Sequence, residues 1–172
     1  NSITTNNFVI PADKDVTLDL NGCTVTNAES HTILNKGHLT LTDSSADKSG
    51  QIISLKGNTA ALRNGDNAVC VVEGGTISRD GANGNTWHVI ENFGDMTFNG
   101  GTWTVRNNGF GACIGSGTSS GSQYDSTLYT SKIEINGGTF ELETSHTGTE
   151  IGACIGTGSS SYNGVEVVIN GG

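Results

Sequence analysis

The chain has 172 residues, a length typical of one domain, and a net charge of −9 with 8 basic side chains. These basic residues form no cluster, which argues against nucleic acid and anionic membrane surfaces as partners. Hydrophobic residues make up only 33% of the chain but recur at regular intervals, so an ordered structure is favoured over disorder. No segment has the periodicity of a long helix or the length of a membrane span, so we expect no membrane insertion.

The first predicted strand lies within residues 1–12, where Phe8 and Ile10 are spaced two apart and Pro11 stands at the strand end. Residues 13–15 are predicted to form a turn. The alternating stretch VTLDL, Val16–Leu20, follows and ends at the corner Asn21–Gly22. This strand-and-corner phrase is the first copy of a unit that recurs through the chain.

Further copies of the phrase occur at Leu39–Thr42, Val69–Ser78, Asp95–Val105, Lys132–Leu142 and Val165–Gly172. Recurrence at intervals of tens of residues indicates stacked repeats. Alignment of the corners predicts one inward column of Leu18, Leu39, Cys70, Met96, Ile133 and Val167. A second inward column contains Leu20, Leu41, Val72, Phe98, Ile135 and Ile169, and a third set after the corner contains Val25, Ile77, Trp103 and Phe140.

A short apolar segment that ends near glycine precedes each later copy, at His31–Gly37, Thr59–Gly65, His88–Gly94, Gly111–Gly117 and Gly152–Gly158. Each repeat therefore has three short strands separated by bends. We predict an all-β fold, a right-handed parallel β-helix of about six rungs with loop insertions. We expect residues 1–172 to form a single domain that is a piece of a longer chain. An antiparallel sandwich is the competing architecture, but it would not return the same phrase in every unit.

The phrases VTLDLNG, INGGTF and GACIG resemble repeats of pectate-lyase-like, right-handed parallel β-helix regions in secreted or surface adhesin-like microbial proteins. The resemblance covers nearly the whole chain. It implies an extracellular or cell-surface location, but it does not imply one activity, because this fold serves lyases, hydrolases, tailspikes and passive stalks.

Cys113 and Cys154 hold the same place in the near-identical phrases GACIGSG and GACIGTG. Stacked on neighbouring rungs, they would be near enough for a disulfide, and the alternative is two buried thiols in one column. Cys70 fills a slot of the first inward column, whereas Cys23 replaces a corner glycine and is left unassigned.

No group of residues has the pattern of a catalytic or metal site, so we predict no catalytic residue, metal or cofactor. Arg63, Arg79 and Arg106 are scattered along the chain, and paired-aspartate or Gly-His-Gly motifs are absent. His31 and His88 hold equivalent places and are interpreted as stacked structural residues. The segment Asp43–Gly50 loosely follows a calcium loop, but a solvated turn explains it better.

Tyr124, Tyr129 and Tyr162 lie in Ser/Gly-rich insertions between the repeats. Exposed aromatic residues on loops can contact sugars or proteins, and these three are the candidate ligand-binding residues. The alternative, in which they fold back over the flank of the solenoid, is equally open.

These observations predict a non-enzymatic extracellular surface or fibre protein, an adhesin-like stalk or binding module whose side loops contact a glycan or a cell-surface protein. One alternative is a carbohydrate-active β-helix, such as a polysaccharide lyase, a hydrolase or a tailspike-like depolymerase. Another is a filament subunit that associates end to end, because an uncapped rung has an unpaired strand edge.

Overall fold

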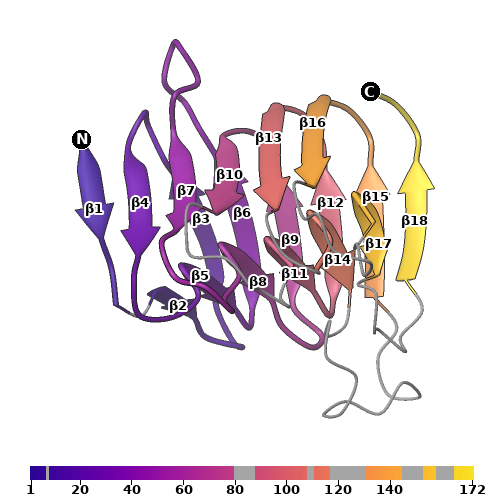
Figure 1. The fold of residues 1–172 in the computed structure, drawn as a ribbon, viewed down its shortest axis with the longest axis horizontal. Helices are drawn as coiled ribbons and strands as arrows, with labels where there is room; N and C mark the ends of the chain where they lie inside the picture. Colours follow the sequence, from indigo (N-terminus) through magenta and orange to yellow (C-terminus); the bar gives the residue numbers. More distant parts are fainter. Residues whose placement is uncertain (7, 80–87, 108–110, 117–130, 145–152, 158–164) are drawn as a thin grey trace.

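The computed structural model describes residues 1–6, 8–79, 88–107, 111–116, 131–144, 153–157 and 165–172. In this part of the chain the strands form parallel sheets in which each strand pairs with its counterpart about one repeat away. The chain winds as a right-handed parallel β-helix of three strands per turn (Figure 1). The predicted fold is confirmed.

Three faces surround the core. Sheet A contains β1 (Ser2–Thr4), β4 (Thr24–Asn27), β7 (Gln51–Ser54) and β10 (Thr76–Arg79). Along the same face in Figure 1, the row continues with the paired strands β13 (Thr102–Asn107) and β16 (Thr139–Thr144).

Sheet B contains β2 (Phe8–Ile10), β5 (Ile33–Asn35), β8 (Leu62–Asn64), β11 (Ile90–Asn92), β14 (Ile114–Ser116) and β17 (Ile155–Thr157). Sheet C contains β3 (Asp15–Asp19), β6 (His38–Thr42), β9 (Val69–Val72), β12 (Asp95–Phe98), β15 (Ser131–Ile135) and β18 (Val165–Ile169). Six strands in each of these sheets correspond to six rungs in the described structure.

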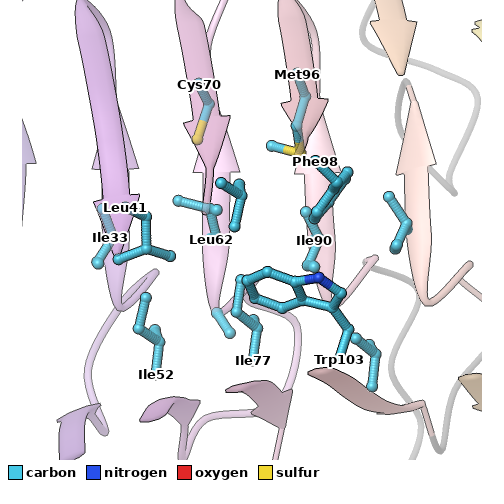
Figure 2. Close-up of a cluster of buried hydrophobic side chains, with 14 of the residues drawn as sticks. Ile33, Leu41, Ile52, Leu62, Cys70, Ile77, Ile90, Met96, Phe98 and Trp103 are labelled. Carbon is cyan, nitrogen blue, oxygen red and sulfur yellow. The ribbon is translucent and has the colours of Figure 1, made fainter. Parts of the chain in front are cut away.

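The core consists of columns of apolar side chains, because a single rung cannot bury its own apolar face and stacking is required. Figure 2 shows side chains from sheets A, B and C meeting in the interior, among them Leu41, Leu62, Ile77 and Ile90. Trp103 is fully buried and meets Phe98 edge to face, with 5.5 Å between ring centroids. The predictions that Trp103 and Cys70 belong to the core are confirmed.

The register of the first rung differs from the prediction by two residues. Val16 pairs with Leu39, and Leu18 pairs with Leu41, whereas alignment on the corner had matched Leu18 with Leu39. Leu20 explains the difference, because it follows β3 and is buried at the corner. It lies so close to Gly50 that a Cβ atom added to Gly50 would be 2.5 Å from the Leu20 Cβ. The remaining rungs pair as predicted, with Cys70 beside Met96 and Met96 beside Ile133.

Two asparagine ladders support the corners on either side of sheet C. In the inner ladder, the Asn35 amide donates to Asn64 Oδ1 at 2.7 Å and the Asn64 amide donates to Asn92 Oδ1 at 2.8 Å, with all three side chains buried. In the outer ladder, Asn136 donates to Asn99, and Asn170 donates to Asn136, at exposed positions. Each ladder repeats one hydrogen bond from rung to rung, which fixes the register of the corner.

The corner that leads from sheet C to sheet A requires glycine. Gly75, Gly101 and Gly138 have φ values of +110°, +96° and +108°, a region that other residues adopt only with strain. These three positions are the second glycine of the repeated Gly-Gly-Thr motif. The motif that identified the repeat in the sequence is therefore a requirement of the backbone at this turn.

Candidate functional site

A buried arginine–glutamate pair lies on the outward side of sheet B. The central positions of β5, β8, β11 and β14 form one column of Leu34, Arg63, Glu91 and Gly115. Arg63 Nε lies 3.3 Å from Glu91 Oε2, and the two side chains are 17% and 0% exposed. An outward position on a strand is normally solvated, so the complete burial of Glu91 sets this column apart.

Burial has a large effect on the ionisation of Glu91. It raises the pKa of this carboxyl to about 8, against the lowering influence of Arg63 and then Arg79. Burial also lowers the pKa of Arg79 to about 10. The carboxyl of Glu91 therefore changes its protonation near neutral pH, a property that is concentrated at functional sites but also occurs in structural ion pairs.

Several contacts fix Arg63 in place. Its guanidinium carbon lies 4.9 Å from the centre of the buried Phe93 ring, which is a cation–π arrangement. Its Nη1 lies 3.3 Å from His31 Nε2. A guanidinium held by a carboxyl and an aromatic ring has little rotamer freedom left to lose on binding a ligand.

His31 and His88 have equivalent structural roles, as the sequence predicted. Nδ1 of His31 accepts the backbone N–H of Ala60 at 2.9 Å, and Nδ1 of His88 accepts that of Ala112 at 2.8 Å. Each imidazole therefore joins one rung to the next. His88 is fully buried and occupies the space above Gly115, where an added Cβ would lie 2.3 Å from the ring. Burial, and then Arg63, lower the pKa of His31 to about 4.

A pocket of about 360 Å³ opens beside this group, over the outward face of the first three rungs. Its polar lining is Arg63, His31, Lys36 and Asp66, and Leu34 and Ala12 are among its apolar residues. The volume lies near the lower end of the range of about 300–1,000 Å³ that is usual for small-molecule sites. The pocket thus combines three nitrogen-bearing side chains, one carboxylate and an apolar wall.

In the segment Asp43–Gly50, the carboxylate of Asp43 holds a corner of the backbone in place. Asp43 Oδ1 accepts the Gly22 N–H at 3.0 Å, and Oδ2 accepts the Gly50 N–H at 2.7 Å. Burial opposes ionisation of Asp43, but these hydrogen bonds and those from Ser45 outweigh it and lower the pKa. Among the described residues, no group of three or more His, Cys, Asp or Glu side chains could hold a metal ion.

Cys113 and Cys154 stack on neighbouring rungs, because the adjacent residues Ile114 and Ile155 are paired in β14 and β17. Both are free thiols in the structure, as are Cys23 and Cys70. The thiol of the buried Cys113 lies 3.2 Å from the Glu143 carbonyl oxygen, and burial raises its pKa to about 12. A bond between Cys113 and Cys154 under oxidising conditions stays a prediction.

The three tyrosines predicted to bind a ligand, Tyr124, Tyr129 and Tyr162, lie outside the described residues. The structure instead brings together residues that the sequence analysis left apart. The sequence analysis described Arg63 and Arg79 as scattered, but the charges of both lower the pKa of Glu91. Glu91 itself was not singled out, although the charge between the apolar residues of HVIENFG was a signal that could have found it.

Within the part of the chain that the structure describes, no helix is long and apolar enough to cross a membrane. No protein-family model, curated protein or solved structure matches the chain.

Proposed function

We propose that this chain is a non-enzymatic extracellular surface or fibre protein of the adhesin-like kind, a rigid β-helix that binds a glycan or a cell-surface protein through its flank. One observation carries the proposal: many of the polar side chains on and beside the rungs bond to the backbone or to side chains of neighbouring rungs. Asp43 and the inner asparagine ladder are examples. Side chains whose hydrogen bonds hold neighbouring rungs together are not free to act in catalysis.

A glycan array combined with two activity assays tests this proposal. The array reports binding, and assays for new reducing ends and for unsaturated products report hydrolysis and lyase chemistry. We expect binding to a restricted group of glycans without release of either product. Turnover of any polysaccharide by this chain would overturn the non-enzymatic proposal.

The carbohydrate-active alternative rests on Glu91. A carboxyl with a pKa near neutrality beside an arginine has the properties of a general acid or base. Its complete burial argues against direct contact with a polymer, because proton transfer requires the substrate within hydrogen-bond reach. Retention of all product formation in a Glu91→Gln variant would exclude this carboxyl from catalysis.

The filament alternative rests on the last described rung. Ile169 is 67% exposed and Val167 is 38% exposed, and Ile169 lines a hollow together with Ile135, Phe140 and Ile155. Burying these side chains against a second copy would remove apolar surface from water. Light scattering across a concentration series would detect such association, and charged substitutions at Val167 and Ile169 would abolish it.

A further inference from the structure

Two of the four cysteines stand side by side, at the start of β14 and of β17. The first residues of these strands, Ile114 and Ile155, are paired. Cys113 and Cys154 each precede them by one residue and therefore share one register. The backbone N–H of Ile114 donates to the Cys154 carbonyl at 3.0 Å. Neighbouring strands lie about 4.8 Å apart, within the Cα separation of about 4.4–6.8 Å that a disulfide allows.

Both thiols are directed at the same strand of the next face. Cys113 Sγ lies 3.2 Å from the Glu143 carbonyl oxygen, and Cys154 Sγ lies 3.6 Å from the carbonyl oxygen of Leu142, the preceding residue in β16. A thiol is a weak donor, so little stabilisation is lost when the two sulfurs leave these carbonyls for each other. Burial first, and then the nearby Cys154, raise the pKa of Cys113 to about 12.

The surroundings of the two thiols differ, and this difference sets an order of reaction. Cys113 is completely buried, whereas Cys154 is exposed. The thiolate is the reactive form of cysteine, and burial disfavours it at Cys113. Cys154 is therefore the thiol that a dissolved oxidant reaches first. Cys70 has no such arrangement, because Leu39 and Met96 are its stacked neighbours in sheet C.

We propose that Cys113 and Cys154 form a redox-dependent clamp, in which a disulfide made by exchange with a small dissolved disulfide joins the rung of β17 to the rung of β14. First, the Cys154 thiolate attacks one sulfur of the small disulfide, forms a mixed disulfide and releases one small thiolate. The Cys113 thiol then gives up its proton and attacks Cys154 Sγ, and the second small thiolate leaves. The two cysteines lose two electrons and two protons, and the small disulfide is reduced to two thiols. The clamp does not depend on the proposed binding function.

The clamp acts on the more weakly packed of the two strands. In the part of the chain that the structure describes, β17 is an end strand of sheet B and pairs with β14. All residues of β14 are buried, whereas those of β17 are only half-buried. Rungs of a solenoid are held by their neighbours, and poorly buried segments open first. A covalent link at Cys154 therefore restrains β17 and leaves distant rungs unchanged.

The test equilibrates the chain with mixtures of reduced and oxidised glutathione, once in native buffer and once in concentrated urea. Free thiols are then blocked, and peptide mapping by mass spectrometry measures the fraction of chains that carry each bond. We expect a link between Cys113 and Cys154. Because the stacked rungs hold the two thiols together, we expect the link to be at least about tenfold more favoured over the reduced form in the native chain than in urea.

Two variants and one matched control test the order of reaction. Cys113→Ser should stop at one glutathione bound to Cys154. Cys154→Ser should leave the buried Cys113 unmodified in native buffer. Cys23→Ser removes a thiol outside the pair and should leave the link unchanged.

Hydrogen exchange measures the clamp itself. Oxidation should slow exchange roughly tenfold at the amides of β17, because opening of this strand then requires β14 to move with it. The amides of β2, at the other end of sheet B, are the internal control and should exchange at the same rate in both forms.

Four results would overturn the proposal. The first is the absence of a link at every glutathione ratio, and the second is a link no more favoured in native buffer than in urea. The third is modification of Cys113 in Cys154→Ser as readily as of Cys154 in Cys113→Ser. The fourth is a link that leaves exchange at β17 unchanged. Should Cys113→Ser fail to fold, the wild-type equilibrium, Cys154→Ser and hydrogen exchange still decide.

Discussion

The outward faces of sheets B and C have the same alternating pattern but very different electrostatics. On sheet C, Lys132 lies 2.8 Å from Glu134, with the two side chains 39% and 27% exposed. On sheet B, Arg63 pairs with a Glu91 that is completely buried. An exposed pair is screened by water and contributes about 0–1 kcal/mol, whereas loss of one partner from a buried pair leaves an uncompensated charge. Burial therefore determines how much a pair of basic and acidic side chains contributes to stability.

Glu91→Ala should cause the largest loss of stability. The substitution removes a completely buried side chain and leaves Arg63 without its carboxyl partner. We expect a loss of about 3–5 kcal/mol in the free energy of unfolding. Glu134→Ala on sheet C is the matched control, with an expected cost of less than about 1 kcal/mol. Urea denaturation followed by circular dichroism measures both, and equal costs would remove the distinction between the two faces.

Asn64→Ala tests the same contrast in the asparagine ladders. The buried Asn64 accepts from Asn35 and donates to Asn92 and to the Asp95 carbonyl, so its loss removes several buried hydrogen bonds at once. We expect a cost of at least about 2 kcal/mol, because each hydrogen bond contributes about 0.5–1.5 kcal/mol. Asn136→Ala removes the middle residue of the exposed ladder and should cost about 0.5–1 kcal/mol. A larger cost for Asn136→Ala than for Asn64→Ala would show that exposure to water does not determine how much each ladder contributes to stability.

Gly115→Ala tests the packing on the outward side of sheet B. The new methyl group would lie 2.3 Å from His88 Nδ1, and a buried ring has little room to move. We expect a loss of about 1–3 kcal/mol from overpacking. At Gly74, beyond the end of β9 in sheet C, an added Cβ would approach the Asp43 nitrogen only to 3.6 Å, an ordinary contact. Gly74→Ala should leave the thermal midpoint nearly unchanged.

The last expected effect is a change in the pH dependence of stability. The folded-state pKa of Glu91 is about 8 against an ordinary 4.5, so the folded protein holds this proton more tightly. The corresponding stabilisation is fully present below pH 4.5 and is lost as the pH rises toward 8. His31 acts in the opposite direction, because its pKa is lowered from 6.5 to about 4 and stability is lost as the pH falls through that interval.

Glu91→Gln should therefore flatten the decline in unfolding free energy between pH 6.5 and pH 8, the part of the Glu91 interval that lies above the titration of His31. Glu134→Gln should leave that interval unchanged, because the hydrogen bond and charge of Lys132 lower the pKa of Glu134 and place its titration in acid. A decline that persists in Glu91→Gln would mean that another group causes it.

The repeated phrase determined much of the fold from sequence alone. Alternation in strands such as Lys132–Ile135 assigned inward and outward residues, and the corners, three of which are Gly-Gly-Thr, aligned five of the six copies correctly. The first copy failed because Leu20 is also apolar and lies next to the corner, so the period-two pattern fitted two registers equally well. Only the pairing of β3 with β6 in the structure decided between these two registers.

The candidate site could not be predicted in this way. Arg63 and Glu91 are 28 residues apart and become neighbours only when β8 and β11 stack. Alternation alone would place both side chains outward, since the sequence pattern gives the direction of a side chain and not what covers it. The sequence by itself determined the solenoid, because backbone geometry and apolar spacing are local properties. The tertiary structure alone decided which outward charges are buried, because burial depends on segments that are distant in the chain.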